Sequence, residues 1–197
     1  MKKIFMVALI AFLIGRVPVA QAGSITGKVD ISGQSNLENT VVYLENVGGS
    51  FSLPTKRPFM NHINLQFAPH VLAVMKGTTV DFPNSDPVLH SAFSISKSNP
   101  FELGVYGQGH EKYATFRNPG VVELLCHIHS HMQAYLLILE NPHFAVTAKD
   151  GSFVIHDVPD GTYQIKAWAA PEVSGVKTVT VNGSKSVPLN FTLATRK

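Results

Sequence analysis

Residues 121–140 read VVELLCHIHSHMQAYLLILE. Apolar segments with strand character flank a short polar loop. Within this loop, Cys126, His129 and Met132 follow one another at intervals of three residues. A regular strand alternates its side chains between two faces, whereas a loop can direct several of them at one point. The spacing therefore predicts a metal site on a tight loop between two strands.

The rest of the chain has the pattern of an all-β protein. Short segments with alternating or β-branched residues recur, and turn signals such as Asp150-Gly151 and Pro159-Asp160-Gly161 separate them. After residue 22 no long stretch keeps a helical period. Gly and Pro within 96–112 leave room there for a short helix only. The pattern predicts an all-β sandwich or barrel.

Residues 1–22 predict a secretory signal peptide. Lys2-Lys3 precede the apolar run 4–14, which is too short to span a bilayer, and Ala20-Gln21-Ala22 is a cleavage signal. Arg16 and Pro18 interrupt the apolar stretch and disfavour the alternative, an uncleaved membrane anchor. We therefore expect export to the periplasm and no membrane span in the mature form.

Charge excludes some classes of partner. The chain has 16 Lys and Arg against 13 Asp and Glu, and three of the basic residues lie in the predicted signal peptide. The remainder therefore has 13 of each sign and is formally neutral. No basic tract indicates nucleic-acid binding, and no run of charge indicates a membrane surface.

Cys126 is the single cysteine of the chain. It cannot form an internal disulfide, and an exported free thiol is open to oxidation unless it is buried or bound to metal. A buried apolar role and a metal-ligand role are the two interpretations.

A fourth candidate ligand lies upstream. His90 follows a strand and a Pro/Asn/Asp turn in PNSDPVLHSAF, residues 83–93. Two imidazoles, one thiolate and a weak axial thioether form the ligand set of blue-copper electron-transfer sites. Zinc also suits Cys and His, but Met is a poor zinc ligand. The set therefore favours copper.

Residues 65–140 resemble the cupredoxins, such as plastocyanin, pseudoazurin and amicyanin. The resemblance is carried by the strand motif G-x-x-V-x-F-x-N at 77–84, the Pro119-Gly120 turn and the Cys-x-x-His-x-x-Met loop. More closely, the chain resembles bacterial plastocyanin-like proteins of the "methylamine utilisation protein" type. The resemblance implies one copper ion, Cu(I) or Cu(II), with four ligands. These are His90, Cys126, His129 and Met132.

Two histidines of the loop depart from the common motif. His127 or His131 could replace His129 or Met132, which would make the site more tetragonal and less blue. Hydrogen bonds from outside the ligand set should orient the ligands. Ser91 and Asn84 are the candidates for this role, and ordinary turn positions are the alternative. For the histidines elsewhere, exposed or hydrogen-bonded roles are favoured; these are His62, His70, His110, His143 and His156.

The ends of the chain resemble a carboxypeptidase regulatory-like domain, a small transthyretin-like sandwich. The motifs are T-x-x-D-G-x-F at 147–153, V-P-x-G-x-Y at 158–163 and the strands SITGKVDISG and TVVYLEN near the N-terminus. The resemblance implies a copper domain at 51–140 inserted between residues 23–50 and 141–197. The alternative is three consecutive pieces, with residues 24–48 adding strands to the copper unit.

The leading functional hypothesis is one-electron transfer between exported redox proteins such as periplasmic cytochromes, and the protein is expected not to be an enzyme. The rival hypothesis is copper binding for storage, delivery or resistance, which the surplus histidines would suit. In cupredoxins an apolar patch around the exposed His ligand is the docking surface. Its candidate members here are Pro69, Pro87, Val88, Ile128 and Met132.

Overall fold

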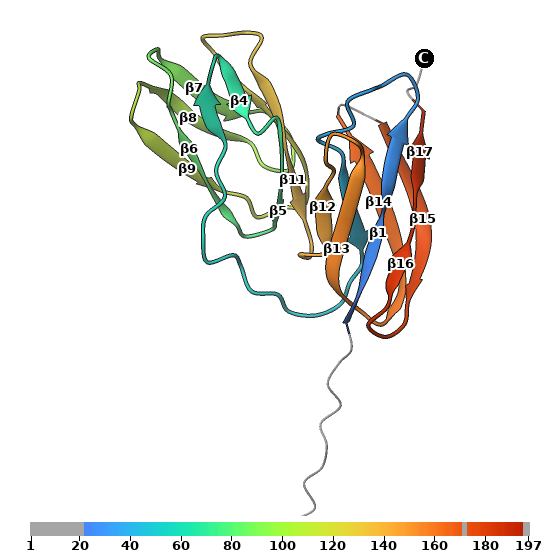
Figure 1. The fold of residues 1–197 in the computed structure, drawn as a ribbon. Coiled ribbons are helices and arrows are strands. Elements are labelled where there is room, and N and C mark those ends of the chain that lie inside the picture. Colours follow the sequence, from blue (N-terminus) through green and yellow to red (C-terminus); the bar gives the residue numbers. More distant parts are fainter. Residues whose placement is uncertain (1–21, 171–172, 195–197) are drawn as a thin grey trace, which may run out of the picture.

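A computed structural model describes residues 22–170 and 173–194, and these residues form an all-β protein (Figure 1). The prediction of an all-β fold is confirmed. No described helix is long and apolar enough to cross a membrane. The predicted signal peptide lies outside the described residues except for Ala22, which begins the first strand.

Residues 96–112 form no helix, although the sequence left room for a short one there. This stretch forms strands β8 (Phe101–Tyr106) and the start of β9 (Glu111–Thr115). Gly104 and Gly109 within it have φ of 64° and 76°, which a regular right-handed helix does not accommodate.

The N-terminal and C-terminal segments of the described chain together form one β-sandwich, called here the terminal sandwich. In its first sheet β1 pairs antiparallel with β13 and parallel with β16 and β17; in its second, the order is β12-β2-β14-β15. The strands are β1 (Ala22–Ile31), β2 (Val41–Glu45), β12 (Phe144–Val146), β13 (Ser152–Pro159), β14 (Gly161–Ala169), β15 (Val173–Val181), β16 (Ser186–Pro188) and β17 (Phe191–Leu193).

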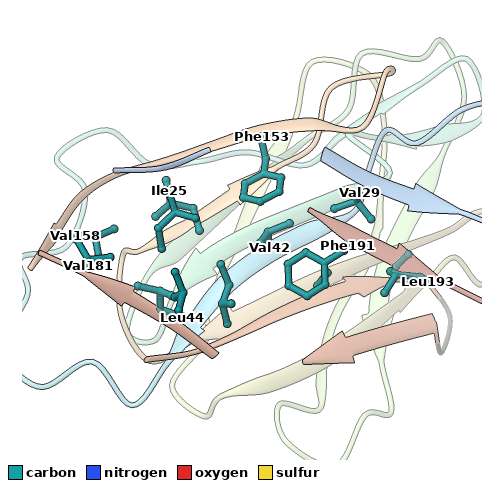
Figure 2. Close-up of a cluster of buried hydrophobic side chains, with 14 of the residues drawn as sticks. Ile25, Val29, Val42, Leu44, Phe153, Val158, Val181, Phe191 and Leu193 are labelled. Atoms are coloured by element: carbon teal, nitrogen blue, oxygen red, sulfur yellow. The ribbon is translucent and has the colours of Figure 1, made fainter. Parts of the chain in front are cut away.

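Aliphatic and aromatic side chains fill the space between these two sheets (Figure 2). Ile25 and Val29 from β1 face Val42 and Leu44 from β2, and Phe153 lies among them. Alternate residues of each strand point inward, as the period of two requires. The terminal sandwich therefore has an apolar core of its own.

The turn predicted at Asp150-Gly151 is present, although it does not join two paired strands. β12 and β13 belong to different sheets, and the turn carries the chain across the sandwich. Gly151 has φ of +79°, and a Cβ there would lie 2.1 Å from the carbonyl oxygen of Val29. A glycine is required because both the conformation and the close approach exclude a side chain.

The middle of the chain builds the second unit, called here the central sandwich. Its main sheet has the order β5-β11-β10-β7-β8, and the pairs β6–β9 and β3–β4 cover the inner face. The strands are β3 (Asn61–Ile63), β4 (Gln66–Ala68), β5 (Val71–Met75), β6 (Thr79–Pro83), β7 (His90–Ser94), β8, β9, β10 (Gly120–Leu125) and β11 (Gln133–Leu139).

β11 is apolar along nearly its whole length because it is buried on both faces. Leu136 and Ile138 face the core of the central sandwich. Tyr135 and Leu137 face the other way and pack against Trp168 of the terminal sandwich. An apolar run without alternation is the pattern of a strand covered on both sides. The two sandwiches thus share a hydrophobic interface beside the strand that follows the predicted metal loop.

Candidate metal centre

The candidate ligands come from two elements of the central sandwich. His90 is the first residue of β7, and residues 126–132 form the loop that joins β10 to β11. The turn before His90 is shaped by Asn84, whose Oδ1 accepts the backbone N–H of Asp86 at 2.9 Å. The amide of Asn84 donates to the carbonyl of Val88 at 2.9 Å. This pattern of an Asx turn gives Asn84 a local role in placing His90.

Three of the predicted ligands converge on one point. His90, Cys126 and His129 each offer one ligand atom, and these atoms all lie within 4.8 Å of one another. The Nδ1 atoms of the two histidines are 3.2 Å apart. His90 and Cys126 are buried, while His129 is partly exposed. The cluster therefore lies directly beneath the surface, with one imidazole toward solvent.

Met132 follows in the same loop and is buried in the same core as Cys126, with 1% of its surface exposed. Its backbone N–H donates to the carbonyl of His129 at 3.0 Å and closes the loop. The sequence-based expectation that Met132 contributes to an apolar docking surface is wrong, because its side chain does not reach solvent. Its role as axial ligand stays a prediction.

The thiol of Cys126 lies among hydrogen-bond donors. Burial raises its pKa, but backbone hydrogen bonds from Ser91, His129 and Ile128 lower it by more. The Ser91 hydroxyl adds a weak bond to Sγ at 3.8 Å and accepts the N–H of His127 at 2.9 Å. The net effect is a pKa below that of a free thiol, which favours the thiolate form that binds metals. The Ser91 hydroxyl therefore links β7 to the 126–132 loop, and its role in orienting the ligands stays a prediction.

Two residues that sequence analysis did not single out lie behind His90. The carboxylate Oδ2 of Asp86 is 2.8 Å from His90 Nε2, and both groups are buried. His62, which is fully buried, stacks on the ring of His90 with centroids 5.1 Å apart. Asp86 lies only four residues before His90, so the sequence could have identified it as a carboxylate close to a candidate ligand. His62 is far away in sequence and has no ligand spacing.

The alternative ligands of the loop are placed differently. His127 is exposed; its ring stacks on Phe93 with centroids 3.7 Å apart, and Nε2 bonds Glu102 at 2.7 Å. His131 is also exposed, and its ring centroid is 6.2 Å from that of His129. Neither belongs to the three-residue cluster.

The donor set suits copper. A thiolate is a soft ligand and imidazole suits copper in both oxidation states, whereas hard cations prefer oxygen ligands. Among the described residues, the cluster of possible ligands contains no carboxylate, and the carboxylate of Asp86 binds Nε2 of His90, the nitrogen that points away from the cluster. The residues present therefore fit a copper ion better than calcium or magnesium.

Several solved structures are similar to part of this chain. A copper-containing nitrite reductase from Thermus scotoductus SA-01 aligns over 48% of this chain at 27% identity, with a TM-score of 0.43. This chain spans only 25% of the length of the reductase. Amicyanin from Paracoccus versutus aligns over 44% of this chain and 85% of its own, at 14% identity and a TM-score of 0.41.

A purple cupredoxin from Nitrosopumilus maritimus aligns over 42% of this chain and 99% of its own, at 20% identity and a TM-score of 0.38. No protein-family model and no curated protein matches the chain. In each of the three structures the likeness extends to less than half of this chain.

Proposed function

We propose that this chain is an exported protein that binds one copper ion and transfers single electrons between redox partners, without acting as an enzyme. His90, Cys126 and His129 would hold the ion, with Met132 as a further, weak ligand. The observation that carries the proposal is the convergence of two imidazole nitrogens and a low-pKa thiol beneath the surface. Copper bound there would supply a couple between Cu(I) and Cu(II).

The chain's own groups prepare such a site. The hydrogen bonds to Cys126 favour the thiolate, and burial of His90 and Cys126 excludes water. The bond from the Met132 N–H to the His129 carbonyl keeps the loop short and closed. A donor set held in one arrangement needs little rearrangement when the oxidation state changes, which suits electron transfer.

Exposed apolar residues adjoin two of the candidate ligands in the sequence. Val88 and Leu89 precede His90, Ile128 precedes His129, and these three expose 41%, 55% and 43% of their surface; Pro69 and Pro87 are exposed as well. We propose that this apolar surface contacts redox proteins such as cytochromes, and that the protein acts in the periplasm. Leu89 joins the surface in place of the buried Met132.

Copper storage, delivery or resistance is the competing function, and the surplus histidines are its basis. His127 is engaged by Glu102 and Phe93 on the side of the sheet, so it is held away from the cluster. This favours electron transfer. A fast reversible couple with slow metal loss would support electron transfer, whereas rapid exchange of the ion with a chelator would support storage or delivery.

We also propose that the central sandwich, residues 51–140, is inserted in a transthyretin-like sandwich made by residues 23–50 and 141–197. The pairing of β1 with β13, and of β2 with β12 and β14, supports this division. A chain of three consecutive pieces would instead pair β1 or β2 with strands of the central sandwich.

The first test is the visible and EPR spectrum of the Cu(II)-loaded protein, beside Cys126→Ser and His127→Gln. We expect an intense thiolate-to-copper band and a small copper hyperfine splitting, both lost in Cys126→Ser. His127→Gln is the control from the same loop and should keep both. A pale, tetragonal spectrum that Cys126→Ser leaves unchanged would overturn the proposal and indicate copper held by His127 and His131.

A further inference from the structure

The side of His90 that faces away from the cluster is bound by a carboxylate. The ring is fully buried, its Nδ1 faces His129, and its Nε2 lies 2.8 Å from Asp86 Oδ2. An ionised carboxylate only accepts hydrogen bonds, so the proton of the neutral ring belongs on Nε2. The lone pair of Nδ1 then faces Cys126 and His129, which is the form that a metal ion requires.

Asp86 is itself held by the tip of the β3–β4 hairpin. Its two carboxylate oxygens accept the backbone N–H groups of Asn64 at 2.6 Å and Leu65 at 2.9 Å. These two residues have φ of 55° and 56° and form the two-residue turn of the hairpin. The hydrogen bonds from these two N–H groups and from His90 fix the carboxylate in place, and an aspartate is ordinarily ionised at neutral pH.

His62 lies on the first strand of the same hairpin, β3, and its ring packs against the ring of His90. The two rings are 23° from parallel, with centroids 5.1 Å apart. His62 Nδ1 donates to the carbonyl of Pro83 at 2.9 Å, while its Nε2 is buried without a hydrogen-bond partner. Burying an unpartnered nitrogen is unfavourable, and a phenylalanine would fill the space without that cost. An imidazole at this position indicates a role beyond filling space.

We propose that Asp86 and His62 are positioning residues of the metal site. The β3–β4 hairpin supplies His62 and holds Asp86 in place. Asp86 fixes the tautomer of His90, the stacked ring of His62 fixes its plane, and the buried carboxylate favours Cu(II) over Cu(I). The inference rests on the proposed copper function. According to this inference, Asp86 and His62 orient the buried ligand His90, and Asp86 shifts the balance between the two oxidation states, although neither residue is a ligand.

The preference for Cu(II) follows from charge. Asp86 places a negative charge one imidazole ring away from the ion, and Cu(II) carries one positive charge more than Cu(I). Because both groups are buried, water screens this attraction poorly. Removing the charge should therefore weaken Cu(II) binding more than Cu(I) binding and make the reduction potential more positive.

The test compares Asp86→Asn with Glu102→Gln. Glu102 also binds a histidine through a carboxylate, but that histidine is His127, outside the cluster, and the pair is exposed. We expect Asp86→Asn to raise the Cu(II) dissociation constant about 10- to 100-fold, with a smaller change for Cu(I) and a more positive potential. Glu102→Gln should change neither, because solvent screens the exposed charge. Equal, small effects of both substitutions would overturn the role of Asp86.

His62→Phe tests the second positioning residue. It also provides a test of the proposal if Asp86→Asn does not fold. The phenyl ring retains the shape and removes both nitrogens. We expect a folded protein whose copper hyperfine splitting and visible band differ from those of the wild type. Unchanged spectra would show that His62 only fills space.

Nitrogen NMR of the copper-free protein separates this inference from the copper assignment. We expect His90 to carry its proton on Nε2 in the wild type and to populate both tautomers in Asp86→Asn. A wild type without a thiolate–copper band would contradict the proposed function alone. A blue wild type whose His90 tautomer is mixed would contradict the positioning role alone.

Discussion

The two sandwiches bury different kinds of side chain. The central sandwich buries a connected group of polar residues around the candidate site: His62, Asn84, Asp86, His90 and Ser91. In the terminal sandwich, the side chains of buried Asn141 and Thr147 donate to backbone carbonyls, while the Thr40 hydroxyl and the His143 Nε2 are buried without a partner and are not connected into a group around a site. The space between its sheets holds an apolar cluster (Figure 2).

This difference separates stability from function. Buried polar groups cost free energy unless all their partners are present, so they are expected where their chemistry is used. The central sandwich accepts that cost around His90. The terminal sandwich contributes apolar burial, and part of it covers β11 beside the metal loop.

Removing a large side chain from the terminal core should have the greatest effect on stability. Phe153 is 4% exposed within that cluster. We expect Phe153→Ala to lower the free energy of unfolding by about 3–5 kcal/mol, because a cavity remains. Urea unfolding measures the loss. The neighbouring Val154, 42% exposed, provides the control Val154→Ala, for which we expect a change within about 0.5 kcal/mol. A changed copper spectrum in folded Phe153→Ala would break the separation between the two units.

Leu137 tests the interface between the sandwiches. It is 2% exposed and faces Trp168, whereas its cross-strand neighbour Val121 is 40% exposed. Leu137→Ala should cost about 2–5 kcal/mol, and Val121→Ala far less. Unfolding followed by Trp168 fluorescence and by the copper band should then no longer coincide. Coincident curves with an unchanged midpoint would show that the interface contributes little.

The smallest expected effect is a change in pH dependence. Burial lowers the pKa of His143, and its Nε2 is buried without a partner. Below its ordinary pKa of about 6.5, the unfolded chain binds a proton that the folded protein resists. Stability is therefore full above that pH and falls as the pH drops toward the folded pKa. We expect His143→Phe to reduce this slope by at most about 1.4 kcal/mol per pH unit.

The copper-free protein, unfolded in urea between pH 5 and 8, is the system for this measurement. Burial also lowers the pKa of His62, so this residue contributes a slope of the same sign that His143→Phe leaves in place. An unchanged slope in His143→Phe would show that His143 titrates normally in the folded protein.

Part of the fold and of the site was predictable because the signals are local. The apolar segments on either side of the loop correspond to β10 and β11, and the spacing within the loop identified Cys126 and His129, which meet. The short strands β3 and β4 were missed because three residues carry too little pattern. The last described residues form two short strands instead of one long strand, since β16 and β17 pair with different halves of β1.

The sequence by itself determined the all-β class, the types of candidate ligand and the loop that brings Cys126 and His129 together, because these depend on neighbours a few residues apart. Only the tertiary structure decided which nitrogen of His90 faces the cluster and which residues hold the other. That choice depends on a hairpin whose left-handed turn directs two N–H groups to Asp86 and whose first strand places His62 against His90. Contacts between elements distant in the chain leave no periodicity to detect, so packing had to reveal them.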